Sequence, residues 1–197
     1  MLRILKISAL IWLTAFACVQ ATIIYVPSDY PLIQSAINSS HFGDTVLVAP
    51  GTYLENLVID GHNILLTSNF MFSRSQSDIE NTIIDGNWID RVIVVSGVNT
   101  GAIIKGFTIE NGRTTGSGGG MYVNQSWAAI SNNIIRRNEC GGDGGGIQIF
   151  NGIGTVEIDH NYISYNRSLQ SNGGGISGSH SNIKIENNII LQNFAMK

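Results

Sequence analysis

The last hundred residues of this chain repeat a pattern every 26 to 29 positions. Two asparagine columns mark the repeat, one at Asn133, Asn161 and Asn188, the other at Asn138, Asn166 and Asn193. Glycine triplets lie between the asparagine pairs, and an apolar residue follows each triplet, at Met121, Ile147 and Ile176. A period in the twenties with strand-like composition is typical of a solenoid whose coils stack on one another. We therefore expect an all-β fold.

The alternation of apolar and polar residues inside each repeat predicts half-buried strands. Aligned on the asparagines, three apolar columns result: Ala128, Val156 and Ile183; Ile130, Ile158 and Ile185; Ile135, Ile163 and Ile190. In the preceding coil the alignment places Gly106 in the asparagine column, flanked by Phe107 and Ile109. The pattern predicts a right-handed parallel β-helix of about six coils over residues 22–197.

The asparagine and glycine columns have a structural explanation. Identical amides stacked at the strand spacing of about 4.8 Å can donate to and accept from one another along the stack. Successive glycines permit positive φ angles and close backbone approach at a corner. A phosphate-binding loop would need a strand-to-helix context and a following Lys-Ser or Lys-Thr, which this sequence lacks.

The N-terminus predicts export. Arg3 and Lys6 precede an apolar run over Ile7–Val19, and Val19-Gln20-Ala21 offers small residues for cleavage. This pattern is typical of a secretory signal peptide over residues 1–21, too short for a membrane span of about 20 apolar residues. We expect a protein that is secreted or held at the cell surface, without a membrane span.

Charge and cysteine content exclude some classes of binding partner and of covalent cross-link. Loss of Arg3 and Lys6 with the signal peptide changes the formal charge from −3 to −5. A mildly acidic surface disfavours nucleic acid and anionic membranes as partners. Only Cys140 remains after export, so an intrachain disulfide is excluded and a buried structural role is expected.

The two ends of the solenoid are expected to differ. Residues 22–44 predict an N-terminal strand and a cap: a strand over Ile23–Val26, then a helix beginning near Ser28–Pro31. Its apolar face would consist of Leu32, Ile33, Ala36 and Ile37. The sequence ends at Phe194–Lys197, directly after Asn193 of the second asparagine column, and no segment typical of a capping helix follows that column. An open last rung predicts self-association or further C-terminal coils.

The N-terminal segment resembles a known family. Ile33–Ile37, followed by Gly43–Val46 and Gly51–Glu55, is similar to the opening of pectin-lyase-like β-helix proteins, which include pectinesterases and pectate lyases. Gly51–Glu55 matches the Gly-x-Tyr-x-Glu motif of pectinesterases. With the later coils, the resemblance covers nearly all of residues 22–197, and it implies the β-helix fold and a carbohydrate polymer as partner.

The catalytic motifs of that family are not found. The sequence lacks the later pectinesterase motifs with their catalytic aspartates, glutamine and arginine. It also lacks the Asp-Asp pair, Gly-His-Gly and Arg-Ile-Lys of polygalacturonases, and the clustered carboxylates with which pectate lyases hold Ca²⁺. Asp143 stands alone in its column, beside Ser117 and Asn172.

One short segment combines the remaining chemistry. Asp85, Asp90 and Arg91 flank Trp88 around a turn, and two carboxylates, a cation and an indole could hold a sugar there. Asp85 or Asp90 would then act as acid or base. The alternative is an ordinary Asp-Gly turn with a solvated ion pair.

A second candidate surface follows the glycine triplets. Tyr122, Gln148 and Phe150 are predicted to point outward from adjacent rungs. Stacked aromatic and amide groups suit a glycan chain, although isolated exposed aromatics are also common on protein surfaces. His62, His160 and His180 show no spacing typical of metal ligands, so no metal site is predicted.

Two functional hypotheses remain. The first is a non-catalytic secreted or cell-surface β-helix that binds polysaccharide or serves as a scaffold region of a larger protein, without a cofactor. The second is a carbohydrate-active enzyme similar to pectate lyases, pectinesterases or glycoside hydrolases, which would need Ca²⁺ if it were a lyase.

Overall fold

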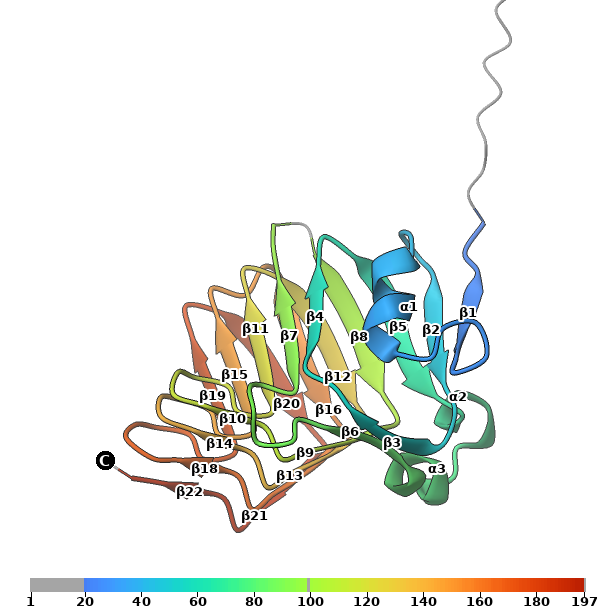
Figure 1. Ribbon diagram of the computed structural model, residues 1–197. Helices are drawn as coiled ribbons and strands as arrows, with labels where there is room; N and C mark the ends of the chain where they lie inside the picture. The colour runs from blue at the N-terminus through green and yellow to red at the C-terminus, as the bar shows by residue number, and fades with distance from the viewer. Residues whose placement is uncertain (1–19, 99, 197) are drawn as a thin grey trace, which may run out of the picture.

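The computed structural model describes residues 20–98 and 100–196 and shows a parallel β-solenoid of about five turns (Figure 1). Sheet A consists of β1 (Ile23–Val26), β2 (Thr45–Val48), β5 (Asn63–Ser68), β8 (Gly101–Lys105), β12 (Trp127–Ser131), β16 (Thr155–Asp159) and β20 (Asn182–Glu186). Sheet B consists of β3 (Gly51–Leu54), β6 (Thr82–Asp85), β9 (Thr108–Glu110), β13 (Ile134–Arg136), β17 (Tyr162–Ser164) and β21 (Ile189–Leu191). Sheet C consists of β4 (Leu57–Asp60), β7 (Ile93–Ser96), β11 (Met121–Asn124), β15 (Ile147–Phe150) and β19 (Ile176–Ser179). Sheet D consists of β10 (Arg113–Thr114), β14 (Glu139–Cys140), β18 (Arg167–Ser168) and β22 (Phe194–Ala195).

Each full turn of the later solenoid runs through sheets A, B, D and C in that order, and every strand pairs in parallel with its equivalent in the next coil. The sequence predicted about six coils, and sheet C has five strands. The difference arises because residues 70–81 form two helices that consume chain length without adding a rung.

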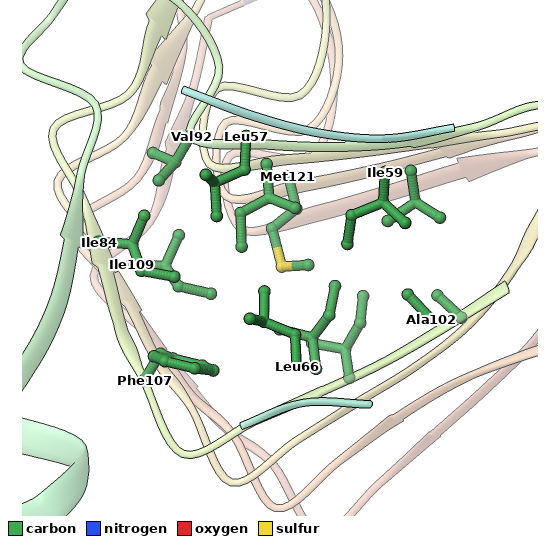
Figure 2. Packing of buried hydrophobic residues seen from close by; sticks show 14 of the residues in the cluster. Leu57, Ile59, Leu66, Ile84, Val92, Ala102, Phe107, Ile109 and Met121 are labelled. Carbon is green, nitrogen blue, oxygen red and sulfur yellow. The ribbon is translucent and has the colours of Figure 1, made fainter. Parts of the chain in front are cut away.

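The predicted strand register is confirmed. Ile130, Ile158 and Ile185 align in one column, and Ile135, Ile163 and Ile190 in another. Figure 2 shows how these columns build the core: Leu57, Ile59 and Met121 of sheet C face Leu66 and Ala102 of sheet A, and Ile84 and Ile109 of sheet B close the third side.

The asparagine ladders are also confirmed. Asn133 Nδ2 donates to Asn161 Oδ1 at 3.1 Å, and Asn161 Nδ2 donates to Asn188 Oδ1 at 3.0 Å. The same pattern links Asn138, Asn166 and Asn193. The expectation for the preceding coil was wrong by one residue, because Phe107 and not Gly106 occupies the first ladder position. Phe107 is buried in the core, and its N–H donates to Asn133 Oδ1 at 3.1 Å.

Residues with left-handed backbone form the corners. Each ladder asparagine directly follows one such residue. In the first ladder, Asn132 precedes Asn133 and His160 precedes Asn161. The corner between sheets B and D places Asn111, Arg137, Tyr165 and Gln192 in this conformation, with φ between 54° and 58°. Non-glycine residues rarely adopt this conformation, so the surrounding structure must compensate the strain. At the corners between sheets A and B and between sheets B and D, the ladder hydrogen bonds lie directly after these residues.

Helix α1 (Ile33–Ser39) packs on the first coil, as predicted, with Ile33, Ala36 and Ile37 fully buried. Its expected start was wrong. The helix begins after Leu32, which is exposed, and no side chain of residues 28–31 caps it. The Glu55 carboxylate caps it instead, accepting the N–H groups of Ile33 at 2.8 Å and Gln34 at 2.9 Å. The glutamate of the Gly-x-Tyr-x-Glu motif therefore serves the fold.

The short helices α2 (Phe70–Ser73) and α3 (Gln76–Asn81) were not predicted. Phe70 and Ile79 pack against Ile134 on the outer face of sheet B, and Thr108 Oγ1 donates to the Ile79 carbonyl at 2.9 Å. Helix α3 therefore covers part of sheet B and leaves the later strands of its outer face uncovered (Figure 1).

Most of the predicted signal peptide lies outside the described residues, which begin at Gln20. Within residues 20–98 and 100–196, no helix combines the length and apolar character that a membrane crossing requires.

Candidate functional site

A row of alternating charges runs along the outer face of sheet D. Arg113, Glu139 and Arg167 occupy the same position in three successive coils. Glu139 Oε1 lies 3.3 Å from Arg113 Nε, and Glu139 Oε2 lies 3.3 Å from Arg167 Nη1. Because rungs are about 4.8 Å apart, one carboxylate can pair with both neighbouring guanidinium groups. Each arginine keeps at least half of its side chain exposed to solvent.

A groove with a volume of about 790 Å³ lies along this row. Its lining residues are Trp88, Ile89, Asp90, Arg91, Arg113, Thr114, Thr115, Glu139, Gly141, Leu169 and Gln170. The loop from Trp88 to Arg91 supplies one wall, and Trp88 is 48% exposed there. A half-exposed indole beside charged groups is the combination with which proteins stack and hydrogen-bond a sugar. We call this the sheet D groove.

The structure separates the two aspartates that the sequence places in one cluster. Asp90 lines the sheet D groove, whereas Asp85 ends β6 on sheet B, in register with Glu110. Asp85 Oδ1 accepts the Asn87 N–H at 2.7 Å, and its Oδ2 accepts from Asn111 Nδ2 at 2.9 Å. One oxygen of Asp85 is thus used within its own turn, and the other holds the corner of the next coil.

Arg91 connects the sheet D groove with sheet C. Its Nη1 lies 3.8 Å from Asp90 Oδ1, and its Nε donates to the Ser117 carbonyl at 2.7 Å. The guanidinium carbon lies 4.9 Å from the centre of the Tyr122 ring, a cation–π distance. A Cβ at Gly116 would come within 2.7 Å of Arg91 Nη2, so glycine leaves the space that the guanidinium uses.

The predicted surface on sheet C is only partly available. Tyr122, Gln148 and Phe150 point outward from β11 and β15. However, Gln148 is 3% exposed; its Nε2 donates to the Ile149 carbonyl, and its buried Oε1 has no partner. The corner before this strand is tight: a Cβ on Gly144 would approach Gln148 Cα to 2.9 Å. Phe150 packs edge-on against His180 at 6.0 Å.

The loops between sheets D and C form a polar stack rather than a reactive site. Asp143 accepts hydrogen bonds from Ser171 Oγ and from the Asn172 N–H, and these bonds lower the pKa of the Asp143 carboxyl. The Asp143 N–H donates to Ser117 Oγ at 3.0 Å. Burial raises the pKa of the Cys140 thiol, whose Sγ donates to the Gly142 carbonyl at 3.0 Å. Cys140 therefore has the buried structural role that the sequence predicts.

Within the described part of the chain, no three His, Cys, Asp or Glu side chains are grouped in a way that could hold a metal ion. Comparison with protein-family models, with curated proteins and with solved structures gives no significant match.

The arginine–glutamate row on sheet D was not predicted from the sequence. A signal for it was present, because Arg113, Glu139 and Arg167 follow Gly112, Asn138 and Asn166, which share one ladder column. A charge that alternates in sign at the period of the repeat predicts a row of ion pairs once the strands are known to be in register.

Proposed function

We propose that this protein is a secreted or cell-surface β-solenoid of the pectin-lyase-like type that binds a glycan in the sheet D groove without transforming it. The observation that carries the proposal is the half-exposed Trp88 beside the row of Arg113, Glu139 and Arg167. The indole offers a face for a pyranose ring, and the charged groups offer hydrogen bonds to hydroxyl groups.

The engagement of the carboxylates supports binding rather than turnover. Glu139 is held from both sides by arginines, and Asp85 lies outside the groove with both oxygens hydrogen-bonded. A glycosidase needs two carboxyl groups placed on opposite sides of the scissile bond, one of them free to donate a proton. The rigid row suits a platform along which several sugar units lie.

A binding screen of the purified protein against defined oligosaccharides tests this function. Trp88→Ala should weaken binding of any captured glycan by about tenfold, because the sugar ring loses its stacking partner. Phe42→Ala, which removes an exposed aromatic side chain distant in sequence from the groove loop, is the matched control. Equal affinities of wild type and Trp88→Ala would contradict the proposed site.

One observation favours an enzyme as the second candidate: Asp90 and Glu139 line the same groove. If they act as an acid and base pair, the protein should cleave a polysaccharide and Asp90→Asn should abolish cleavage while leaving the thermal midpoint unchanged. Reducing-sugar release and absorbance of unsaturated products, with Ca²⁺ supplied, distinguish hydrolysis and elimination from binding alone.

A further inference from the structure

A second groove, which we call the sheet B groove, lies on the outer face of sheet B beside helix α3. Its volume is about 340 Å³. Its lining residues are Gln76 and Glu80 of α3, Ile134 and Arg136 of β13, Tyr162 and Ser164 of β17, and the corner residues Arg137 and Tyr165. Helix α3 supplies one wall because Ile79 anchors it on Ile134.

An unsatisfied hydroxyl lies at the floor of this groove. Ser164 is 1% exposed, and its Oγ is one of two buried side-chain polar atoms in the described chain that lack a hydrogen-bond partner. Buried polar groups are almost always paired, and a ligand in the groove could supply the partner that Ser164 Oγ lacks. The second such atom, Gln148 Oε1, lies on sheet C, outside the sheet B groove.

The cationic groups that line the groove differ in how far they are neutralised. Arg136 Nε donates to Glu110 Oε2 at 2.7 Å, and Glu110 is largely buried, so this pair is neutral overall. Arg137 is exposed at its corner, and across residues 20–98 and 100–196 its guanidinium has no carboxylate within 4.0 Å. Arg137 therefore offers an uncompensated positive charge.

An aromatic ring lies one rung away from that charge. The Arg137 N–H donates to the Ser164 carbonyl at 3.4 Å, which places Tyr165 directly above or below Arg137 in the next coil. Both residues have left-handed backbone at the same corner, on rungs that are about 4.8 Å apart. At the far wall, the carboxylate of Glu80, which accepts a hydrogen bond from Gln76 Nε2 at 3.3 Å, makes that end acidic and unsuited to an anion.

We infer that the sheet B groove binds a sugar that carries an oxyanion, either a carboxylate or a sulfate, with the ring on Tyr165, the oxyanion on Arg137 and a hydroxyl on Ser164 Oγ. The acidic wall at Glu80 fixes the orientation, because only the neutral side of the sugar can face it. Arg137 and Tyr165 also border two hollows on the sheet D side, so one glycan chain can cross this ridge into the sheet D groove. The inference rests on the proposed glycan binding and adds a second site with its own ligand chemistry.

Calorimetric titration of the purified protein with three probes tests the inference. Hexagalacturonate carries carboxylates, a sulfated galactan hexamer carries sulfates, and cellohexaose carries neither. At least one acidic probe should bind, and Arg137→Gln should weaken it about tenfold and reduce its salt dependence. Glutamine occupies equivalent left-handed positions at Gln125 and Gln192, so this substitution preserves the corner. Arg74→Gln, an exposed arginine outside both grooves, is the control.

Two further variants separate binding from folding. Tyr165→Asn keeps a residue type that this chain uses at left-handed corners and should weaken every probe that occupies the groove. Ser164→Ala should weaken the acidic probe while leaving or raising the thermal midpoint, because it removes a hydroxyl that is unsatisfied without ligand. A purely structural role for Ser164 would not produce these opposite changes.

The outcomes distinguish the two sites. If Arg137→Gln, Tyr165→Asn and Ser164→Ala all bind like wild type while Trp88→Ala loses binding, the sheet B groove is not a site and the proposed function stands. If Trp88→Ala binds like wild type and the three sheet B variants do not, the sheet D groove is not the site. Binding of cellohexaose alone, or of no probe, overturns the oxyanion inference.

Discussion

The two ends of the described solenoid contain equivalent apolar columns in different surroundings. In the first coil Val46 and Val48 are fully buried, because α1 and β1 cover them. In the last described coil Ile185 is 47% exposed and Ile190 is 48% exposed, although both lie in register with the fully buried Ile158 and Ile163. Burial in a solenoid is therefore supplied by the neighbouring coil or cap and not by the residue itself.

The asparagine ladders also become more exposed towards the last described coil. Asn133 and Asn161 are 2% exposed, whereas Asn188 at the end of the same ladder is only half-buried. The hydrogen bonds between the side-chain amides have nearly the same length along the stack, 3.1 Å and 3.0 Å. Their contributions to the free energy of unfolding should differ, because an unsatisfied amide is most destabilising where water cannot replace the lost partner.

The largest expected effect is on association. A polypeptide limited to residues 22–197 should self-associate, because the half-exposed Ile185 and Ile190 of the last described coil and the strand edges beside them can pair with another copy. Sedimentation velocity should show a mass that rises with concentration, and Ile185→Lys should lower it towards that of the monomer. A wild-type chain that stays monomeric at every concentration would remove this contrast between the two ends.

The second prediction compares one column at two positions. Ile158→Ala should cost about 2–5 kcal/mol of unfolding free energy, because it leaves a cavity in a fully packed core. Ile185→Ala should cost well under half as much, because the side chain is about half solvated before it is removed. Urea denaturation under dilute conditions measures both, and equal losses would mean that the last coil is covered in solution.

The third prediction compares the amides in the same way. Asn161→Ala should destabilise the fold by about 1–3 kcal/mol, because the Asn133 N–H and Nδ2 both lose their acceptor. Asn188→Ala should cost less, and Lys184→Ala on the exposed strand face should leave the denaturation midpoint nearly unchanged. Equal midpoints for the Asn161 and Lys184 variants would contradict a stabilising role of the ladder.

The smallest expected effect is a pH dependence in the loop stack. The pKa of Asp143 is lowered in the folded state by the hydrogen bonds from Ser171 and Asn172. A carboxyl with a lowered folded pKa contributes stability above its ordinary pKa, and this contribution is lost as pH falls through the folded value. Asp143→Asn should therefore be slightly less stable than wild type at pH 7, and the difference should shrink as the solution is acidified. Thermal melts from pH 7 down to pH 2 measure this, and a difference that grows on acidification would show that the opposite sign holds.

Much of the architecture could be predicted from the sequence because it depends on local periodicity. The alternation in each repeat placed Ile130, Ile158 and Ile185 in one inward column, and the asparagine spacing predicted the amide stack, both of which the structure confirms. The helices α2 and α3 were missed because they interrupt the repeat in a segment without internal periodicity. The cap of α1 was misplaced because the carboxylate that caps it, Glu55, is 22 residues away from Ile33 in sequence.

The candidate site was predictable only in part. The sequence identified Trp88, Asp90 and Arg91, which line one groove, but it could not separate Asp85 from them. It identified Gln148 as outward-pointing, but it did not show that this side chain is buried.

The sequence by itself determined the repeat, the register and the composition of the core, because a strand forces alternate side chains to opposite faces. Only the tertiary structure decided which outward columns meet. Arg113, Glu139 and Arg167 become one row, and Arg137 and Tyr165 one ridge, through parallel pairing of coils 26 to 28 residues apart. Whether such a row lies open or covered depends on loop lengths and helix placement, which bring together residues that share no local pattern.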